Sequence, residues 1–256
     1  MLSVFSSCSR PLDISEVQEK VKGLSQSGHW DEASSFVDQQ LQAPRWQPGS
    51  NEHWVLKLLK AEQLSEDRKC DVIGSILNPG IPQDELLNAE RRMHLAYCNR
   101  DQPSNDSRVV LESALEVANK HKFKNLSGRI LMRLGAMDHE GNRLEDAQRK
   151  FELALSQAKD SKDEKLIASC LLDLALTMQS ANRLDEALHF GEEARNRFAN
   201  LKHQRGFAFA TRNLGSYSIR LGDIDRAKTL LEEAQVNGIK QSWLAYRTGK
   251  CRRGIG

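Results

Sequence analysis

The sequence predicts an all-α protein, a solenoid of about six antiparallel helix pairs. Three observations support this fold class. Short elements recur every 40 residues over 105–236, small residues hold the same place in each copy, and all six prolines lie within the first 103 residues. Because proline breaks helices, the part of the chain that follows is free to form nearly continuous helix pairs. Repeats of this length stack on their neighbours and share a core.

The repeat consists of three separated elements that keep one spacing. The segment Asn142–Ala147 recurs as Asn182–Ala187 and as Gly222–Ala227. A leucine followed by a small residue precedes each copy, at Leu134-Gly135, Leu174-Ala175 and Leu214-Gly215. A third element ends at Ala154, Ala194 and Ala234, and an earlier copy of it is Leu111–Ala114. Three elements with one spacing are more specific than any single short motif.

The small residues have a steric explanation. Gly135, Ala175 and Gly215 are expected where the two helices of a pair approach closely, with Ala147, Ala187 and Ala227 facing them. A larger side chain would overpack this contact at a cost of about 1–3 kcal/mol. Gly and Asn between the two elements predict the turn, since both tolerate the left-handed conformation that ends a helix. Acidic residues after the turn suit the first turn of the next helix.

The elements follow in order along the chain. Residues 1–12 are a leader or the remnant of a lipoprotein signal, and 13–103 hold degenerate helix pairs. The first pair is expected to have one helix over 13–27 and a second that ends near 42. The next two pairs are expected at 52–65 and 66–77, and at 83–100 and 105–121. Residues 104–240 form the regular array, with pairs at about 123–160, 163–199 and 203–236. Residues 241–256 lose the periodic Leu and Gly positions and read as a truncated repeat or an irregular basic tail.

The pattern resembles the tetratricopeptide repeat family. Leu134-Gly135, Ala147, Phe151 and Ala154 match the family's order of Leu-Gly, Ala-x3-Phe and Ala. The period of 40 is longer than the common 34, the closing proline is missing, and Gly191 replaces a large apolar residue. HEAT repeats have a similar length but lack the small close-contact pair, so they rank lower. The resemblance spans 13–236 and implies a right-handed α-solenoid that binds a protein or peptide in its concave groove, without catalysis or cofactor.

The first helix of each pair lines the concave face in such arrays. The residues on these helices that do not face the paired helix are therefore the candidate groove residues. They are Arg129, Met132, Arg133, Ala136 and His139; Ser169, Leu172, Asp173, Leu176 and Gln179; and Phe209, Arg212, Asn213, Ser216 and Ile219. Leu172 and Leu176 are instead expected to pack against adjacent repeats. The mixture of Arg, Asn and Gln suits an extended peptide with acidic groups.

The beginning of the sequence suggests a lipid anchor. Small residues before Cys8 resemble the end of a bacterial lipoprotein signal, although the charged and apolar parts of such a signal are absent; a frayed terminus is the alternative. This leader, followed by Trp-Asp-Glu-Ala and 40-residue repeats, is similar to the N-terminal half of bacterial proteins with a caspase-like CHAT peptidase domain. The chain is then either cytoplasmic or lipid-anchored in the bacterial envelope. An alternative function is the sensor or recruiting arm of a larger effector, either such a peptidase or a transcription regulator.

The sequence does not indicate a nucleic-acid-binding, membrane-spanning, metal-binding or catalytic site. A balance of 37 basic and 35 acidic residues offers no basic stripe for nucleic acid, and no apolar run is long enough to span a membrane. No CxxC or HExxH motif suggests a metal site, so Cys98 and Cys170 are predicted to be small apolar core residues. The cluster Asp138-His139-Glu140 is read as a solvated helix end. We therefore assign no catalytic, metal-binding or cofactor-binding residue.

Overall fold

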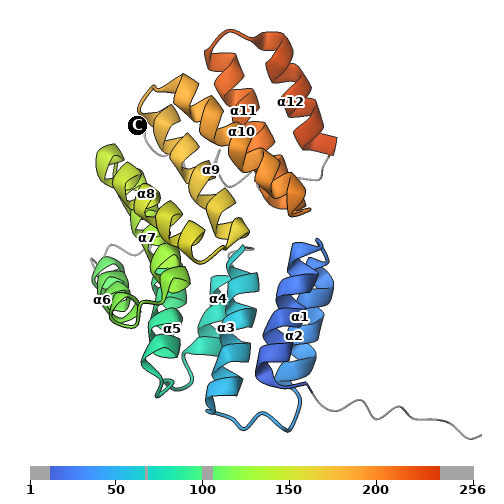
Figure 1. Ribbon diagram of the computed structural model, residues 1–256, viewed down its shortest axis with the longest axis vertical. Helices are drawn as coiled ribbons and strands as arrows, with labels where there is room; N and C mark the ends of the chain where they lie inside the picture. Colours follow the sequence, from blue (N-terminus) through green and yellow to red (C-terminus); the bar gives the residue numbers. More distant parts are fainter. Residues whose placement is uncertain (1–11, 67–68, 100–105, 237–256) are drawn as a thin grey trace, which may run out of the picture.

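A computed structural model describes residues 12–66, 69–99 and 106–236, in which we find twelve helices and no strand (Figure 1). The helices are α1 (Ile14–Gln26), α2 (Trp30–Leu41), α3 (Asn51–Glu66), α4 (Cys70–Leu77), α5 (Glu85–Cys98), α6 (Asp106–Lys120), α7 (Lys124–Glu140), α8 (Leu144–Asp160), α9 (Glu164–Ser180), α10 (Leu184–Asn200), α11 (Gln204–Arg220) and α12 (Ile224–Val236). The starts of α7, α9 and α11 are evenly spaced. The predicted fold class, a right-handed α-solenoid of six antiparallel pairs, is confirmed.

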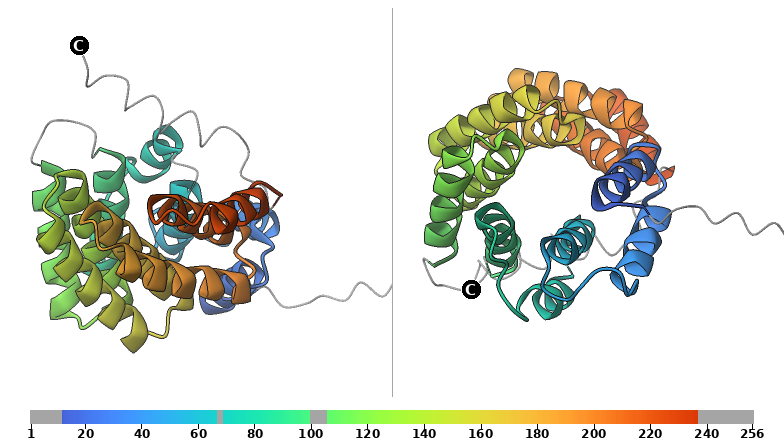
Figure 2. Two further views of the ribbon diagram at one scale, coloured as in Figure 1. Left: turned by 90° about the horizontal axis from the view of Figure 1, so that it is seen from above. Right: turned by 60° about the horizontal axis from the view of Figure 1, so that its bottom comes forward.

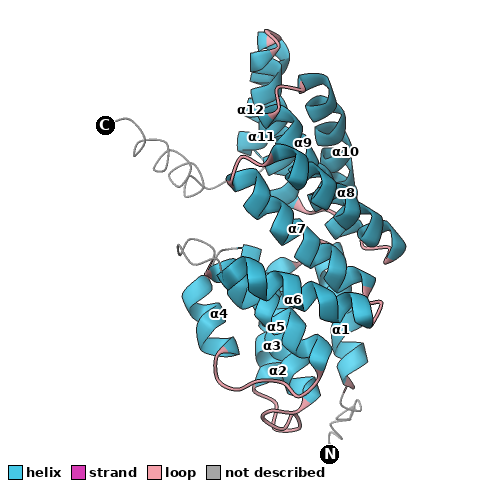
Figure 3. Cartoon of the chain, turned by 90° about the vertical axis from the view of Figure 1, so that its left-hand side faces the viewer, coloured by secondary structure: helices cyan, strands magenta, loops and turns pink. Residues whose placement is uncertain are grey.

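The helices form two layers that curve into a ring. Each odd-numbered helix contacts the next odd-numbered helix as well as its own partner, whereas the described even-numbered helices do not contact one another. The odd-numbered helices therefore make up the inner, concave layer, as the sequence predicted. Figure 2 shows that the array completes about one turn, so that the first pair lies beneath the fifth and sixth pairs; Figure 3 shows the same stacking from the side.

Two kinds of turn close the helices. Within the regular pairs, Asn142, Asn182 and Gly222 have φ of 57°, 60° and 82°, which confirms the predicted left-handed positions. Between pairs, three lysines take the same conformation, which the sequence did not predict: Lys122, Lys162 and Lys202. At each turn a backbone N–H bonds to a carbonyl inside the preceding helix, as Arg143 does to Asp138 at 2.9 Å. The turns thus satisfy helix-end carbonyls and fix the angle between successive helices.

The small residues make room for a specific side chain in each regular pair. A Cβ atom on Gly135 would lie 2.8 Å from the ring of Phe151, and one on Gly215 would lie 2.9 Å from Leu231. The main partner is therefore this larger residue, four positions beyond the predicted alanine. The middle pair has small residues, Ala175 and Gly191, at both positions. Leu214 of the next repeat fills the space at Gly191, since a Cβ there would lie 2.9 Å from it.

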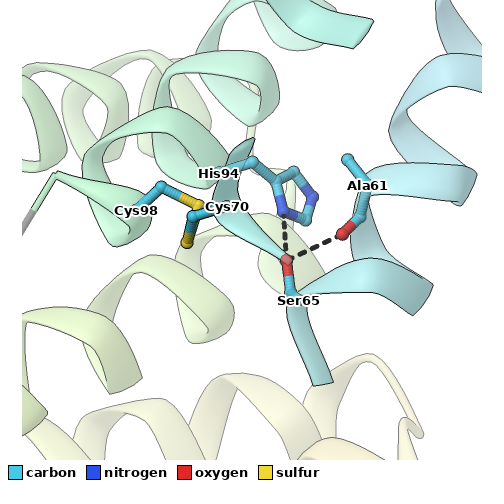
Figure 4. Close-up of a disulfide and its surroundings, with 5 residues drawn as sticks. All are labelled: Ala61, Ser65, Cys70, His94 and Cys98. Carbon is cyan, nitrogen blue, oxygen red and sulfur yellow. Dashed lines mark hydrogen bonds between the residues drawn. A yellow bond between two sulfur atoms is a disulfide. The ribbon is translucent and has the colours of Figure 1, made fainter. Parts of the chain in front are cut away.

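The prediction that Cys98 is a free apolar core residue is wrong. Cys98 forms a disulfide with Cys70, and the two Cα atoms are 5.2 Å apart (Figure 4). The bond ties the start of α4 to the end of α5, across a loop of 28 residues. Cys170 is buried and free, as predicted for a small apolar core residue.

A second prediction is wrong for Asp138, which was expected at a solvated helix end but is buried. The side chain of Asp138 is only 2% exposed, and its carboxylate lies 2.7 Å from Arg108, 2.6 Å from Arg143 and 2.6 Å from Lys150. Burial alone would raise the pKa of Asp138, but the three cations outweigh burial and lower it. The cluster joins α6, α7, α8 and the turn between α7 and α8.

The steric account of the glycines is testable with a pair of alanine substitutions. Gly135→Ala should lower the free energy of unfolding by about 1–3 kcal/mol, because Phe151 must move. Gly23→Ala is the matched control. It lies in an exposed part of α1 with nothing within 4 Å of its Cβ position, so it should be neutral or stabilising by up to about 1 kcal/mol. Urea unfolding measures both, and equal effects would contradict the close contact.

Reduction of the disulfide should destabilise the protein. Cys98→Ser is expected to lower the free energy of unfolding by about 2–4 kcal/mol, since the bond restricts the unfolded chain. A reductant should produce a similar loss in the wild type and none in the variant. Thiol titration of the denatured chain before and after reduction counts the bonded cysteines. An unchanged thiol count would show that Cys70 and Cys98 are not bonded.

Candidate functional site

One position on the inner helices is polar in all three regular repeats. Arg133, Asp173 and Asn213 each precede the leucine of the close helix contact, in α7, α9 and α11. We call these three residues the polar row. They occupy equivalent places on adjacent inner helices, and the charge of Arg133 acts on the carboxyl of Asp173. The structure therefore brings predicted groove residues from three repeats into one line.

Two arginines of the concave surface stack on aromatic rings. The guanidinium of Arg133 lies 3.8 Å from the centre of the Tyr97 ring, and that of Arg212 lies 4.6 Å from the Phe209 ring. Such contacts hold an arginine in place without neutralising its charge. Stacking fixes the plane of the guanidinium, and a planar guanidinium matches the geometry of a carboxylate.

Asp173 and Asn213 are polar groups in poorly solvated positions. Burial raises the pKa of Asp173 to about 7, while the nearby charge of Arg133 acts in the opposite direction. Asn213 is 4% exposed, and its Nδ2 atom has no hydrogen-bond partner among the described residues. A buried amide without a partner is uncommon in native proteins and requires an explanation, such as a ligand or a water molecule. The polar row therefore combines a carboxyl that titrates near neutral pH with an unsatisfied donor.

Arg129 is held by carboxylates within the fold. Its guanidinium lies 2.5 Å from Glu90 and 3.6 Å from Glu62, and it also contacts Nε2 of His94 at 3.2 Å. Burial lowers its pKa, but the two carboxylates outweigh burial and raise it. Arg129 thus joins α7 to α3 and α5 within the protein. Neither the acids nor His94 were identified from the sequence, because they lie in the degenerate repeats.

Ser65 and His94 lie close together but are not arranged as a nucleophile and its base (Figure 4). The hydroxyl of Ser65 donates to the carbonyl of Ala61 at 2.7 Å, and His94 Nδ1 is 3.1 Å from the same oxygen. Nδ1 therefore donates to Ser65, and Nε2 faces the donor Arg129. Burial, followed by the charges of Arg129 and Arg133, lowers the pKa of His94 well below its usual value. Both side chains are buried, so the pair serves packing.

The other predicted groove residues divide between the surface and the interior. Met132 and Ala136 pack against the core, and Leu172 is buried, as was expected for it. His139 Nε2 pairs with Ser180 at 2.9 Å, Ser169 donates to the carbonyl of Lys165, and the carbonyl of Gln179 accepts from Arg220. Leu176 and Ser216 are partly exposed, and Ile219 is half-exposed.

The structure bears on the other site classes only where it describes the chain. Cys8, the predicted lipid attachment residue, lies outside the described residues. Over 12–66, 69–99 and 106–236, no group of three or more His, Cys, Asp or Glu residues is placed to hold a metal ion. Within the same ranges, every helix is too short or too polar to cross a bilayer.

Comparison with known proteins finds similarity in structure alone. No family model and no curated protein matches the sequence. Among solved structures, BtubC (BKLC) from P. vanneervenii is similar with a TM-score of 0.58 and 16% identity, over 86% of this chain and 90% of that chain. A STAND ATPase with a tetratricopeptide repeat sensor, from Pyrococcus horikoshii, has a TM-score of 0.51 and 15% identity, over 86% of this chain and 35% of that chain. The fold is thus a tetratricopeptide-like helical solenoid.

The raised pKa of Asp173 makes stability depend on pH. An unfolded carboxyl titrates near 3.8, whereas Asp173 in the fold titrates near 7. Between these values the folded state keeps a proton that the unfolded state has lost, so stability should fall as the pH rises through this window and then level off. Asp173→Asn should remove this part of the slope.

The measurement is urea unfolding at several pH values between about 4 and about 8. Asp185→Asn, on an exposed carboxyl of α10, is the control and should keep the wild-type slope above about pH 5. An Asp173→Asn variant with the same slope as the wild type would mean that Asp173 is ionised in the fold at neutral pH.

Proposed function

We propose that this chain is a protein-interaction module that binds an extended peptide with acidic side chains along its concave surface. The observation that carries the proposal is the polar row, with Arg212 beside it. Arg133 and Arg212 offer guanidinium groups held against aromatic rings. Asn213 offers a buried amide that has no partner within the described part of the chain.

Each group suits a different part of a peptide. The two guanidinium groups can each donate a pair of hydrogen bonds to a carboxylate, and this geometry favours Asp or Glu side chains. Nδ2 of Asn213 can donate to a main-chain carbonyl. Asp173, with a pKa of about 7, can donate as well as accept near neutral pH. Arg129 contributes little, because Glu90 and Glu62 already hold it.

The spacing of the inner helices also suits an extended chain. Neighbouring packed helices lie about 8–10 Å apart, and an extended peptide advances about 3.3 Å per residue. Successive positions of the polar row therefore fall about three peptide residues apart. A ligand of about six to seven residues would reach from α7 to α11 by this estimate.

A second candidate is the sensor or recruiting arm of a larger effector. The similarity to the STAND protein favours it. That protein is described as having a tetratricopeptide repeat sensor, and the match covers only 35% of its chain. A peptidase of the CHAT class or a transcription regulator would then lie on the same polypeptide. Lipid attachment at Cys8 and a place in the bacterial envelope belong to this proposal. The Cys70–Cys98 disulfide supports it, since such bonds persist in oxidising compartments.

Charge reversal on the concave surface tests the peptide proposal. We expect the full chain to enrich acidic sequences from a random peptide library displayed on phage. The double variant Arg133→Glu and Arg212→Glu should bind the selected peptides at least about tenfold more weakly, equivalent to about 1.4 kcal/mol, as measured by isothermal titration calorimetry.

Arg149→Glu is the matched control. Its side chain is 69% exposed and lies on α8, in the outer layer. It should leave both affinity and helicity unchanged. Selection of peptides without acidic residues, or equal loss of affinity in the control, would remove the concave arginines from the binding site.

A further inference from the structure

The two ends of the array meet where the ring closes. Trp30 at the start of α2 packs edge-on against His203 at the start of α11, with ring centres 4.7 Å apart. The ammonium of Lys165 on α9 lies 4.9 Å from the Trp30 ring. Gly28, with φ of 83°, approaches Lys202 so closely that a Cβ atom would lie 3.0 Å from its carbonyl oxygen. We call this contact between the first pair and the α9 and α11 ends the closure interface.

A cavity of about 300 Å³ lies at the closure interface. Its walls come from α1 and α3 on one side and from the turn before α9 and the start of α11 on the other. Val21, Leu59 and Leu201 supply apolar surface, and Trp30 forms part of the wall. Residues far apart in the sequence therefore share one cavity only because the ring is closed. Cavities of this size are at the lower end of those that bind small molecules.

Gln63 leaves an unsatisfied amide at this cavity. Both Nε2 and Oε1 of Gln63 are buried and have no hydrogen-bond partner among the described residues. A primary amide offers donors and an acceptor side by side. An amide of a ligand can accept from Nε2 or donate to Oε1. A buried carboxamide without any partner is exceptional, and a ligand that supplies such a bond would account for it.

The acidic residues that line the cavity already have partners. Asp163 accepts from the N–H of Leu166 at 2.9 Å and from Asn125 at 2.7 Å. Glu164 pairs with Arg197 at 2.6 Å, and Glu62 lies 3.6 Å from Arg129. All three carboxylates are thus engaged within the fold.

Two lysines of the cavity lack a carboxylate partner among the described residues. Lys22 of α1 and Lys162 of the α8–α9 turn both line the cavity. Within the described ranges, neither lies within ion-pair distance of a carboxylate. These two ammonium groups therefore face the cavity from both sides of the closure interface without a paired carboxylate.

We propose that this cavity binds a small organic anion that carries a carboxylate and an amide. The carboxylate is held by Lys22 and Lys162, the amide pairs with Gln63, and an apolar group lies against Val21, Leu59 and Leu201. Bonds between an ammonium and a carboxylate are among the stronger hydrogen bonds in proteins. The site is separate from the polar row and does not depend on peptide binding there.

Such a ligand would also favour the closed ring. Lys22 and Gln63 belong to the first and second pairs, whereas Lys162 belongs to the turn that leads into the fifth. A molecule that contacts both sides binds fully only when the ends meet, so its binding free energy shifts the population towards the closed form. The solenoid would thereby report the presence of a small metabolite through its shape.

The probe for this site is N-acetylleucine, which has a carboxylate, an amide and an apolar group. In N-acetylleucine amide, an uncharged carboxamide replaces the carboxylate. We expect calorimetry to detect binding of the acid by the full chain, and the neutral amide to bind at least about tenfold more weakly. Hydrogen exchange of the amides of 27–30 and 201–204 should slow when the acid is added.

The variant Lys22→Gln with Lys162→Asn should lose at least about tenfold in affinity for the acid. Asn is chosen because residue 162 has a positive φ of 55°. Lys122→Asn, at the equivalent turn with φ of 54° and outside the cavity, is the matched control and should bind as the wild type does. Arg133→Glu with Arg212→Glu should also leave probe binding unchanged, which separates this site from the peptide groove.

Three outcomes would overturn the proposal. These are no detectable binding of the acid, equal binding of the acid and the neutral amide, and equal loss of affinity in the Lys122→Asn control. Gln63→Leu tests the amide contact separately, because it removes the amide while keeping an apolar side chain in the wall of the cavity. This variant should bind the acid more weakly than the wild type does, and it should still bind the acid more tightly than the neutral amide.

Discussion

The close approach of the two helices within each regular pair is the constraint on which the rest of the structure depends. The first and third regular pairs place one small and one larger residue across the contact, Gly135 with Phe151 and Gly215 with Leu231. The middle pair is small on both sides, and Leu214 from the next repeat fills the gap at Gly191. A large side chain therefore occupies the space beside the glycine in all three pairs. A pair held at one distance and angle, repeated along the chain, produces a regular curve and an inner layer made of odd-numbered helices.

What could be predicted from the sequence follows from this regularity. The helix positions, the left-handed turns at Asn142 and Asn182, and the face that becomes concave all depend on local residues that recur at a fixed interval. The Cys70–Cys98 bond and the ion cluster of Asp138 were missed for the opposite reason. The bond joins two degenerate repeats and has no motif spacing, and Asp138 receives its cations from α6, α8 and a turn. Its place at a helix end was predicted correctly, but its neighbours were not.

The same distinction holds at the candidate site. Periodicity assigns a residue to a helix face, but it does not say how deep that residue lies or what the next helix supplies. Met132 therefore packs against the core, and Arg129 is an internal ion-pair partner of Glu90. Arg133 and Arg212 lie against aromatic rings. The decisive partners, Tyr97, His94 and Glu90, all lie in α5, whose sequence deviates from the repeat. Burial of Asp173 likewise depends on packing between repeats, and residue type alone does not indicate it.

Closure of the ring adds a property that no single repeat has. In an open solenoid the two ends are independent, and a ligand changes only the repeats that it touches. Here Trp30 and His203 bring the first and sixth pairs together, so a change in curvature anywhere along the inner layer must be accommodated at the closure interface or within the helix contacts. The helix contacts are close-packed against glycines and cannot yield cheaply, whereas the closure interface contains a cavity with an unsatisfied amide. The softest part of the ring is therefore the closure interface.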